Sequence, residues 1–110
     1  MIFDKRRFIR YSCRLGASYR GATGLAVSET TVENISEGGV FFKTDHRLPL
    51  VEVILIYIER PDEEPIAAPI RPVWIKELSA SRYAVGARFV NPSPESVQSL
   101  RSLITAIQPA

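Results

Sequence analysis

Apolar and polar residues alternate along most of this chain, as they do in β-strands that bury one face. We expect strands at residues 11–19, 25–32, 40–44, 51–59, 66–77 and 82–90, separated by short polar segments with glycine, proline or serine. The segment 51–59 carries apolar residues at both odd and even positions, which predicts a strand covered on both faces. In the last segment, Tyr83, Val85, Ala87 and Phe89 alternate with the residues between them.

The period changes after residue 92. Ser93 is a suitable N-cap, Pro94 suits the first helical position, and Glu95 complements the helix dipole. The apolar stripe that follows has spacings of three or four: Val97, Leu100, Ile104 and Ile107. Residues 93–108 are therefore predicted to form a helix. Six strands and one terminal helix predict an all-β fold with a C-terminal helix, a small six-stranded antiparallel β-barrel over residues 11–90.

Length and composition fit one globular domain covering residues 1–110. The chain is 45% hydrophobic and 24% charged, which is typical of a folded, soluble protein. Its single cysteine, Cys13, excludes an internal disulfide and fits a reducing cytoplasm. The longest apolar run, residues 53–58, is too short to cross a bilayer, and Asp4 interrupts any leader-like start. We expect a cytoplasmic domain without membrane insertion.

Basic residues gather at the start of the chain. Net charge is only +2, yet six of the fourteen lysines and arginines fall in the first twenty positions, beside one acidic residue, Asp4. Arg6 and Arg10 are four apart and would share a side in either a helical or an extended segment. Their guanidinium groups suit phosphate oxygens or the N7/O6 edge of guanine, although a solvated basic terminus would look the same. Residues 1–10 lack apolar periodicity and are expected to form a flexible arm.

A short polar segment interrupts the alternation between residues 32 and 42. Asn34, Ser36 and Gly39 stand where a regular strand would continue. Asn and Ser favour turns through local hydrogen bonds, and Gly39 permits either positive φ or a close approach. Taken alone, the segment is a β-bulge or hairpin turn without a ligand as readily as a binding site.

The two motifs in this order resemble the PilZ domain family, which binds the bacterial second messenger cyclic di-GMP. The family signature pairs an Arg-x-x-x-Arg segment with an (Asp/Asn)-x-Ser-x-x-Gly segment on a following strand. This chain has both, as Arg6 and Arg10 followed by Asn34, Ser36 and Gly39. The resemblance implies that these five residues bind cyclic di-GMP. Asparagine replaces the commoner aspartate, which removes a charged, bidentate grip on guanine.

Residues 71–74 and 83–89 look like the family's two late strands, so the resemblance covers nearly the whole chain. It implies the same barrel architecture. Four further residues are secondary candidates for the site. Trp74 would stack on guanine, Arg88 would contact phosphate, and Lys5 would add positive charge to the arm. Arg7 lies within the first motif but points away from its neighbours in an extended chain.

The residues give little support for catalysis or metal binding. His46 is the only histidine and Cys13 the only cysteine, so a His/Cys metal cluster is not expected. The chain has neither a Gly-x-Ser-x-Gly nucleophile motif nor a glycine-rich phosphate loop. We therefore expect a binding module rather than an enzyme, with no cofactor beyond its ligand.

The resemblance implies a cyclic di-GMP receptor or adaptor in bacterial motility or biofilm signalling. With no catalytic domain, it would act by presenting a changed surface to a downstream protein partner that the sequence does not name. One alternative is a PilZ-like interaction module of a type IV pilus or motility system that binds no nucleotide. Another is a barrel that binds single-stranded nucleic acid, but adjacent Phe41 and Phe42 point to opposite faces and make a poor stacking platform. DNA and RNA are therefore not expected partners.

Overall fold

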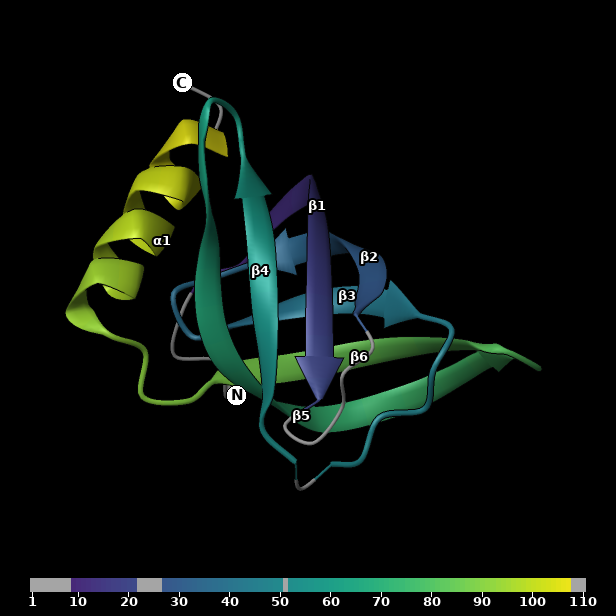
Figure 1. Cartoon of the computed structure of the whole chain (residues 1–110). Helices are drawn as coiled ribbons and strands as arrows, with labels where there is room; N and C mark the ends of the chain where they lie inside the picture. The colour runs from purple at the N-terminus through teal and green to yellow at the C-terminus, as the bar shows by residue number, and fades with distance from the viewer. Residues whose placement is uncertain (1–8, 22–26, 51, 108–110) are drawn as a thin grey trace, which may run out of the picture.

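The computed structural model describes residues 9–21, 27–50 and 52–107. Within them, six antiparallel strands close into a barrel in the order β1-β2-β3-β6-β5-β4, with a helix at its side (Figure 1). This confirms the predicted fold class. The elements are β1 (Tyr11–Gly21), β2 (Ser28–Ile35), β3 (Gly39–Thr44), β4 (Ile54–Arg60), β5 (Glu63–Ser79), β6 (Arg82–Phe89) and α1 (Pro94–Ile107).

The barrel interior is filled by the apolar residues that alternate along the strands. Ile54, Ile56 and Ile58 of β4 all point inward and are buried. On the opposite face, Leu55 and Tyr57 are only half-buried, so the expected cover on both sides of this strand is not found. The reason is that α1 packs against β5 and β1 instead of across β4. The apolar residues that predicted cover on both sides therefore include a set on the outer face of β4 that stays partly exposed to solvent.

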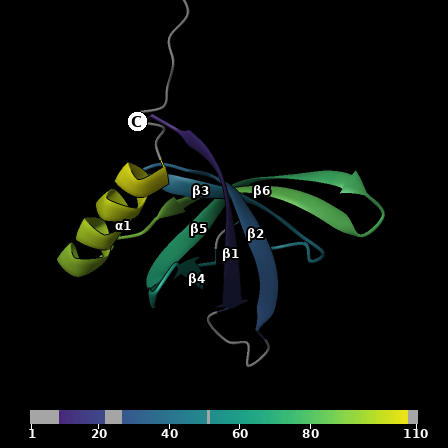
Figure 2. The same ribbon diagram turned by 90° about the horizontal axis from the view of Figure 1, so that it is seen from above.

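Helix α1 completes the core. Leu100, Leu103 and Ile104 are buried in the same cluster as the barrel residues, and Figure 2 shows the helix lying along one side of the barrel. Its predicted start is confirmed, because the Ser93 hydroxyl accepts a hydrogen bond from the amide of Ser96 at 3.1 Å. Among the described residues no helix has the length and hydrophobicity needed to cross a membrane.

The β4–β5 connection is tighter than expected. The sequence predicts a polar loop at residues 61–65, but Pro61 and Asp62 alone form the turn and Glu63 already pairs with Arg60. Asp62 has φ 57°, a left-handed conformation that lets the chain reverse within two residues. Strand β5 then pairs with β4 only as far as Ile70 and continues beside β6 alone.

Candidate functional site

A β-bulge in β2 places Asn34 on the outer face of the barrel. The β2–β3 register runs from Val32 opposite Phe42 to Asn34 opposite Phe41, which leaves Glu33 as an extra residue. Val32 and Ile35 are both fully buried, so the two residues between them point outward together. Regular alternation would have turned Asn34 into the core. The bulge is therefore what makes this carboxamide available at the surface.

A second irregularity lies on the neighbouring strand. The β1–β2 register shifts between Ser12 and Leu15, and Cys13 sits within the shift. Its thiol donates to the carbonyl of Val32 at 3.6 Å. Burial raises the pKa of the Cys13 thiol above its ordinary value, and the carboxylate of Glu33 adds to the rise. This half-buried cysteine therefore packs beside the bulge, and its thiol is held in the protonated form more firmly than a free thiol.

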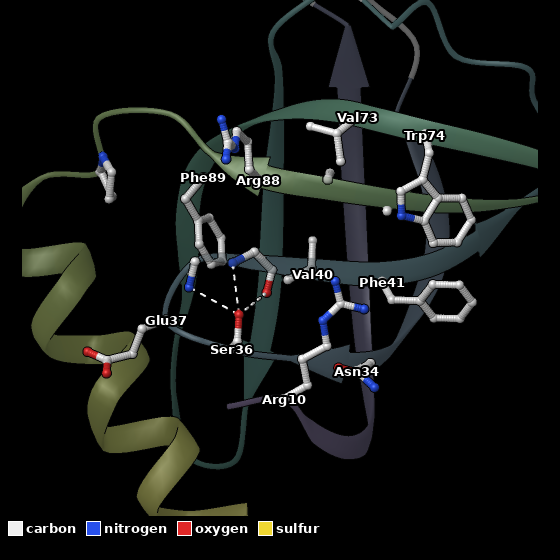
Figure 3. A pocket seen from close by; sticks show the side chains of 15 residues that line it. Arg10, Asn34, Ser36, Glu37, Val40, Phe41, Val73, Trp74, Arg88 and Phe89 are labelled. Carbon is white, nitrogen blue, oxygen red and sulfur yellow. Dashed lines mark hydrogen bonds between the residues drawn. The ribbon is translucent and has the colours of Figure 1, made fainter. Parts of the chain in front are cut away.

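Ser36 organises the turn that links β2 to β3. It is 7% exposed, and its hydroxyl accepts hydrogen bonds from the amides of Gly38 at 3.1 Å and Gly39 at 3.2 Å (Figure 3). The same hydroxyl donates to the carbonyl of Gly39 at 3.5 Å, and the Ser36 amide reaches that carbonyl at 3.0 Å. These contacts engage the hydroxyl within the turn. Ser36 therefore holds the conformation of the turn that borders the site. Its direct contact with a ligand stays a prediction.

Replacing Ser36 with alanine should destabilise the protein because two turn amides lose their acceptor. We expect Ser36→Ala to lower the free energy of unfolding by about 1–2 kcal/mol. Thermal denaturation followed by circular dichroism would measure this as a drop of several degrees. Ser102→Ala, at an exposed position of α1, is the matched control. Equal melting temperatures for the two variants would contradict the structural role of the Ser36 hydroxyl.

Gly39 allows β3 and β6 to approach closely. A Cβ atom at this position would collide with the backbone carbonyl oxygen of Ala87 on β6. No described glycine has positive φ, so of the two expected reasons for glycine at this position, positive φ and a close approach, the structure shows the close approach. Its lack of a side chain is instead required by the facing strand, which also donates from the amide of Phe89 to the carbonyl of Gly38 at 2.9 Å.

These features border a pocket of about 430 Å³ on the outer face of the barrel (Figure 3). Six of the nine predicted site residues line it: Arg10, Asn34, Ser36, Gly39, Trp74 and Arg88. The other three, Lys5, Arg6 and Arg7, lie outside the described residues, as does most of the expected flexible arm at residues 1–10. The structure thus brings the second motif together with two secondary candidates and one arginine of the first motif.

Two aromatic rings form one wall of the pocket. Phe41 and Trp74 lie on either side of Gly86 in the sheet register, with ring centroids 5.7 Å apart and planes inclined by 34°. A Cβ atom at Gly86 would collide with the Trp74 indole, so the absence of a side chain there lets the indole lie against β6. Trp74 is 38% exposed and offers a surface on which a planar ring could stack.

Phe41 is the site residue that sequence reasoning missed. The sequence predicts only that Phe41 and Phe42 point to opposite faces, and Phe42 is the one buried in the core. What the sequence could not supply was a partner, because Trp74 lies more than thirty residues further along the chain and reaches Phe41 only across Gly86. A glycine in the alternating 82–90 segment was the available signal for a large side chain packed over it.

The pocket carries more positive than negative charge. Arg10 and Arg88 contribute guanidinium groups, and Glu37 contributes a carboxylate. That carboxylate is matched from α1, since Arg101 Nε donates to Glu37 Oε1 at 2.5 Å. Among the described residues no group of His, Cys, Asp and Glu is arranged to hold a metal ion. Cations, an amide and aromatic rings together suit an anionic ligand that carries planar bases.

A closed six-stranded barrel with this pocket defines a small ligand-binding domain, and sequence comparison gives its family. The sequence model of the PilZ domain family matches residues 4–106 of this chain. The chain belongs to the PilZ domain family. No curated protein sequence matches it significantly.

Solved structures share the fold at low sequence identity. The chain is similar to the PilZ domain of Escherichia coli YcgR with c-di-GMP, at TM-score 0.73 and 14% identity, covering 94% of this chain and 92% of that one. It is similar to the K. pneumonia MrkH–c-di-GMP complex, at TM-score 0.76 and 12% identity, covering 96% and 52%. It is also similar to the Bacillus subtilis inhibitor of motility MotI, at TM-score 0.76 and 15% identity, covering 94% and 51%. The chain thus spans about half the length of MotI and MrkH.

Proposed function

We propose that this domain is a receptor for cyclic di-GMP. The observation that carries the proposal is the gathering of Arg10, Asn34, Trp74 and Arg88 around one pocket. Cyclic di-GMP has two phosphates and two guanines, so it needs cations, an edge-reading polar group and a stacking surface at one place. A volume of about 430 Å³ lies within the range of small-molecule sites. YcgR and MrkH, which share this fold, have been solved with this ligand.

Each residue has a chemical part in the proposed complex. The Arg10 guanidinium binds phosphate or the N7/O6 edge of guanine through charge-assisted hydrogen bonds. Arg6, which lies outside the described residues, is proposed as its companion on the strength of the Arg-x-x-x-Arg motif. The Asn34 amide oxygen accepts from guanine N1–H or N2–H, as a neutral substitute for a carboxylate. Trp74 stacks on a guanine face.

The proposed output is a change of surface read by a protein partner. A ligand bound in the pocket would change the surface that the domain presents beside β3, β5 and β6, and Arg6 is expected to contribute to it through the first motif. This adaptor role assumes that the pocket binds the ligand without changing it chemically. The partner would bind the domain when cyclic di-GMP is present and would not bind the ligand-free domain.

Trp74 supplies a direct test, because it is the only tryptophan in the chain. Addition of cyclic di-GMP should quench or shift its fluorescence as guanine stacks on the indole. Calorimetric titration of the same protein should show tighter binding of cyclic di-GMP than of GMP or a single-stranded oligonucleotide. Trp74→Phe should remove the signal and retain binding in the calorimeter. Equal affinity for a generic oligonucleotide would contradict the proposal and favour a nucleic-acid-binding barrel.

A further inference from the structure

Two arginines stand directly opposite each other at the edge of the pocket. Arg71 of β5 is the register partner of Arg88 of β6, and both side chains are exposed. Cross-strand partners project from the same face of a sheet. Gly39, the partner of Arg88 on β3, borders the pocket on that face, so both guanidinium groups project on the pocket side. Arg88 lines the pocket and Arg71 lies next to it.

This pair carries a cost in the free protein. Like charges directly opposite each other destabilise a sheet. Among the residues that the structure describes, neither Arg71 nor Arg88 has a carboxylate within salt-bridge distance. Arg82, at the start of β6, instead donates to Asp45 at 2.9 Å. A bound anion would relieve the repulsion between the two unmatched guanidinium groups, and a phosphate could accept from both forks at once.

The position of the pair suits the second phosphate of a cyclic dinucleotide. Figure 3 shows Arg10 and Arg88 on different sides of the pocket, with Arg10 beside the start of β1 and Arg88 on β6. The two phosphates of such a ring lie on opposite sides of it, so a single cation cannot hold both. We propose that Arg71 and Arg88 together bind one phosphodiester of the ligand while Arg10 faces the other. This inference rests on the proposed function and adds Arg71 to the site.

The experiment is a calorimetric titration of cyclic di-GMP into the wild-type chain and Arg71→Gln, with Lys76→Gln as the matched control. Lys76 is another exposed cation of β5, beyond Trp74 and outside the pocket lining. We expect Arg71→Gln to weaken binding by about five- to tenfold. Lys76→Gln should change the affinity by less than about twofold, because it removes only a screened, distant charge. Arg88→Gln should resemble Arg71→Gln.

Thermal melting of the free proteins separates a ligand contact from a structural role. Because Arg71→Gln removes a like-charge pair, its melting temperature should stay unchanged or rise slightly. Unchanged affinity in Arg71→Gln would overturn the inference while leaving the receptor proposal in place. An equal loss of affinity in Lys76→Gln would also overturn the inference, because the general positive charge of β5 would then explain the weaker binding. Absence of binding by the wild-type chain would refute the receptor proposal itself, and the inference with it.

Discussion

Gly39→Ala is expected to lower the free energy of unfolding by about 2–3 kcal/mol, because the added methyl group overpacks the contact between two strands. The new Cβ atom would meet the backbone carbonyl of Ala87, which cannot rotate away as a side chain can. Strands β3 and β6 must therefore separate, and the pocket between them must deform. Thermal or urea denaturation would measure the loss, and ligand titration should show weaker binding.

Gly16→Ala is the matched control for this prediction. A Cβ atom at Gly16 would meet only the carboxylate of Glu59, the mobile end of an exposed side chain. That side chain can turn aside, so we expect a change below about 0.5 kcal/mol. Similar melting temperatures for the two variants would show that the approach of β3 and β6 is not the constraint that demands glycine.

Arg10→Ala is expected to weaken cyclic di-GMP binding by about tenfold to a hundredfold, through loss of a charge-assisted contact worth roughly 1.5–3 kcal/mol. Arg10 is exposed and precedes β1, so the barrel should melt at an unchanged temperature. Calorimetry and thermal melting of the same preparation would provide both values.

Arg14→Ala controls for the loss of positive charge, since Arg14 is an exposed arginine of β1 that does not line the pocket. It should bind the ligand nearly as well as the wild-type chain. If Arg10→Ala instead melts several degrees lower and binds normally, Arg10 is a structural residue. The proposed receptor site would then lose its first motif.

Much of the fold was predictable because one buried face imposes a period of two. The isoleucines of β4 and the Ser93 cap show this, as both were identified from local pattern alone and are confirmed. The errors arose where a single residue changes the geometry. Positive φ at Asp62 shortens a predicted loop to two residues, and the bulge at Glu33 carries β2 on to Ile35, beyond its expected end at residue 32.

The site was predictable where a motif concentrates it and unpredictable where distant strands compose it. Asn34 and Ser36 were predicted from the family motif and both line the pocket, although the turn that engages the Ser36 hydroxyl follows only from the structure. Phe41 and the proposed phosphate-binding residue Arg71 were not predicted, because their positions beside the pocket depend on the register partners Gly86 and Arg88. Local sequence does not encode which residues of separate strands stand opposite each other. Lys5, Arg6 and Arg7 remain predictions from the sequence.

The bulge at Glu33 also bears on how such a site arises in evolution. The additional residue gives two outward side chains, Glu33 and Asn34, between core residues that keep their inward places. A strand with one residue fewer between these two core positions would present a single outward side chain there, as regular alternation requires. Insertion or deletion of a single codon at this point can therefore change which side chains face the candidate site, with no rebuilding of the hydrophobic interior.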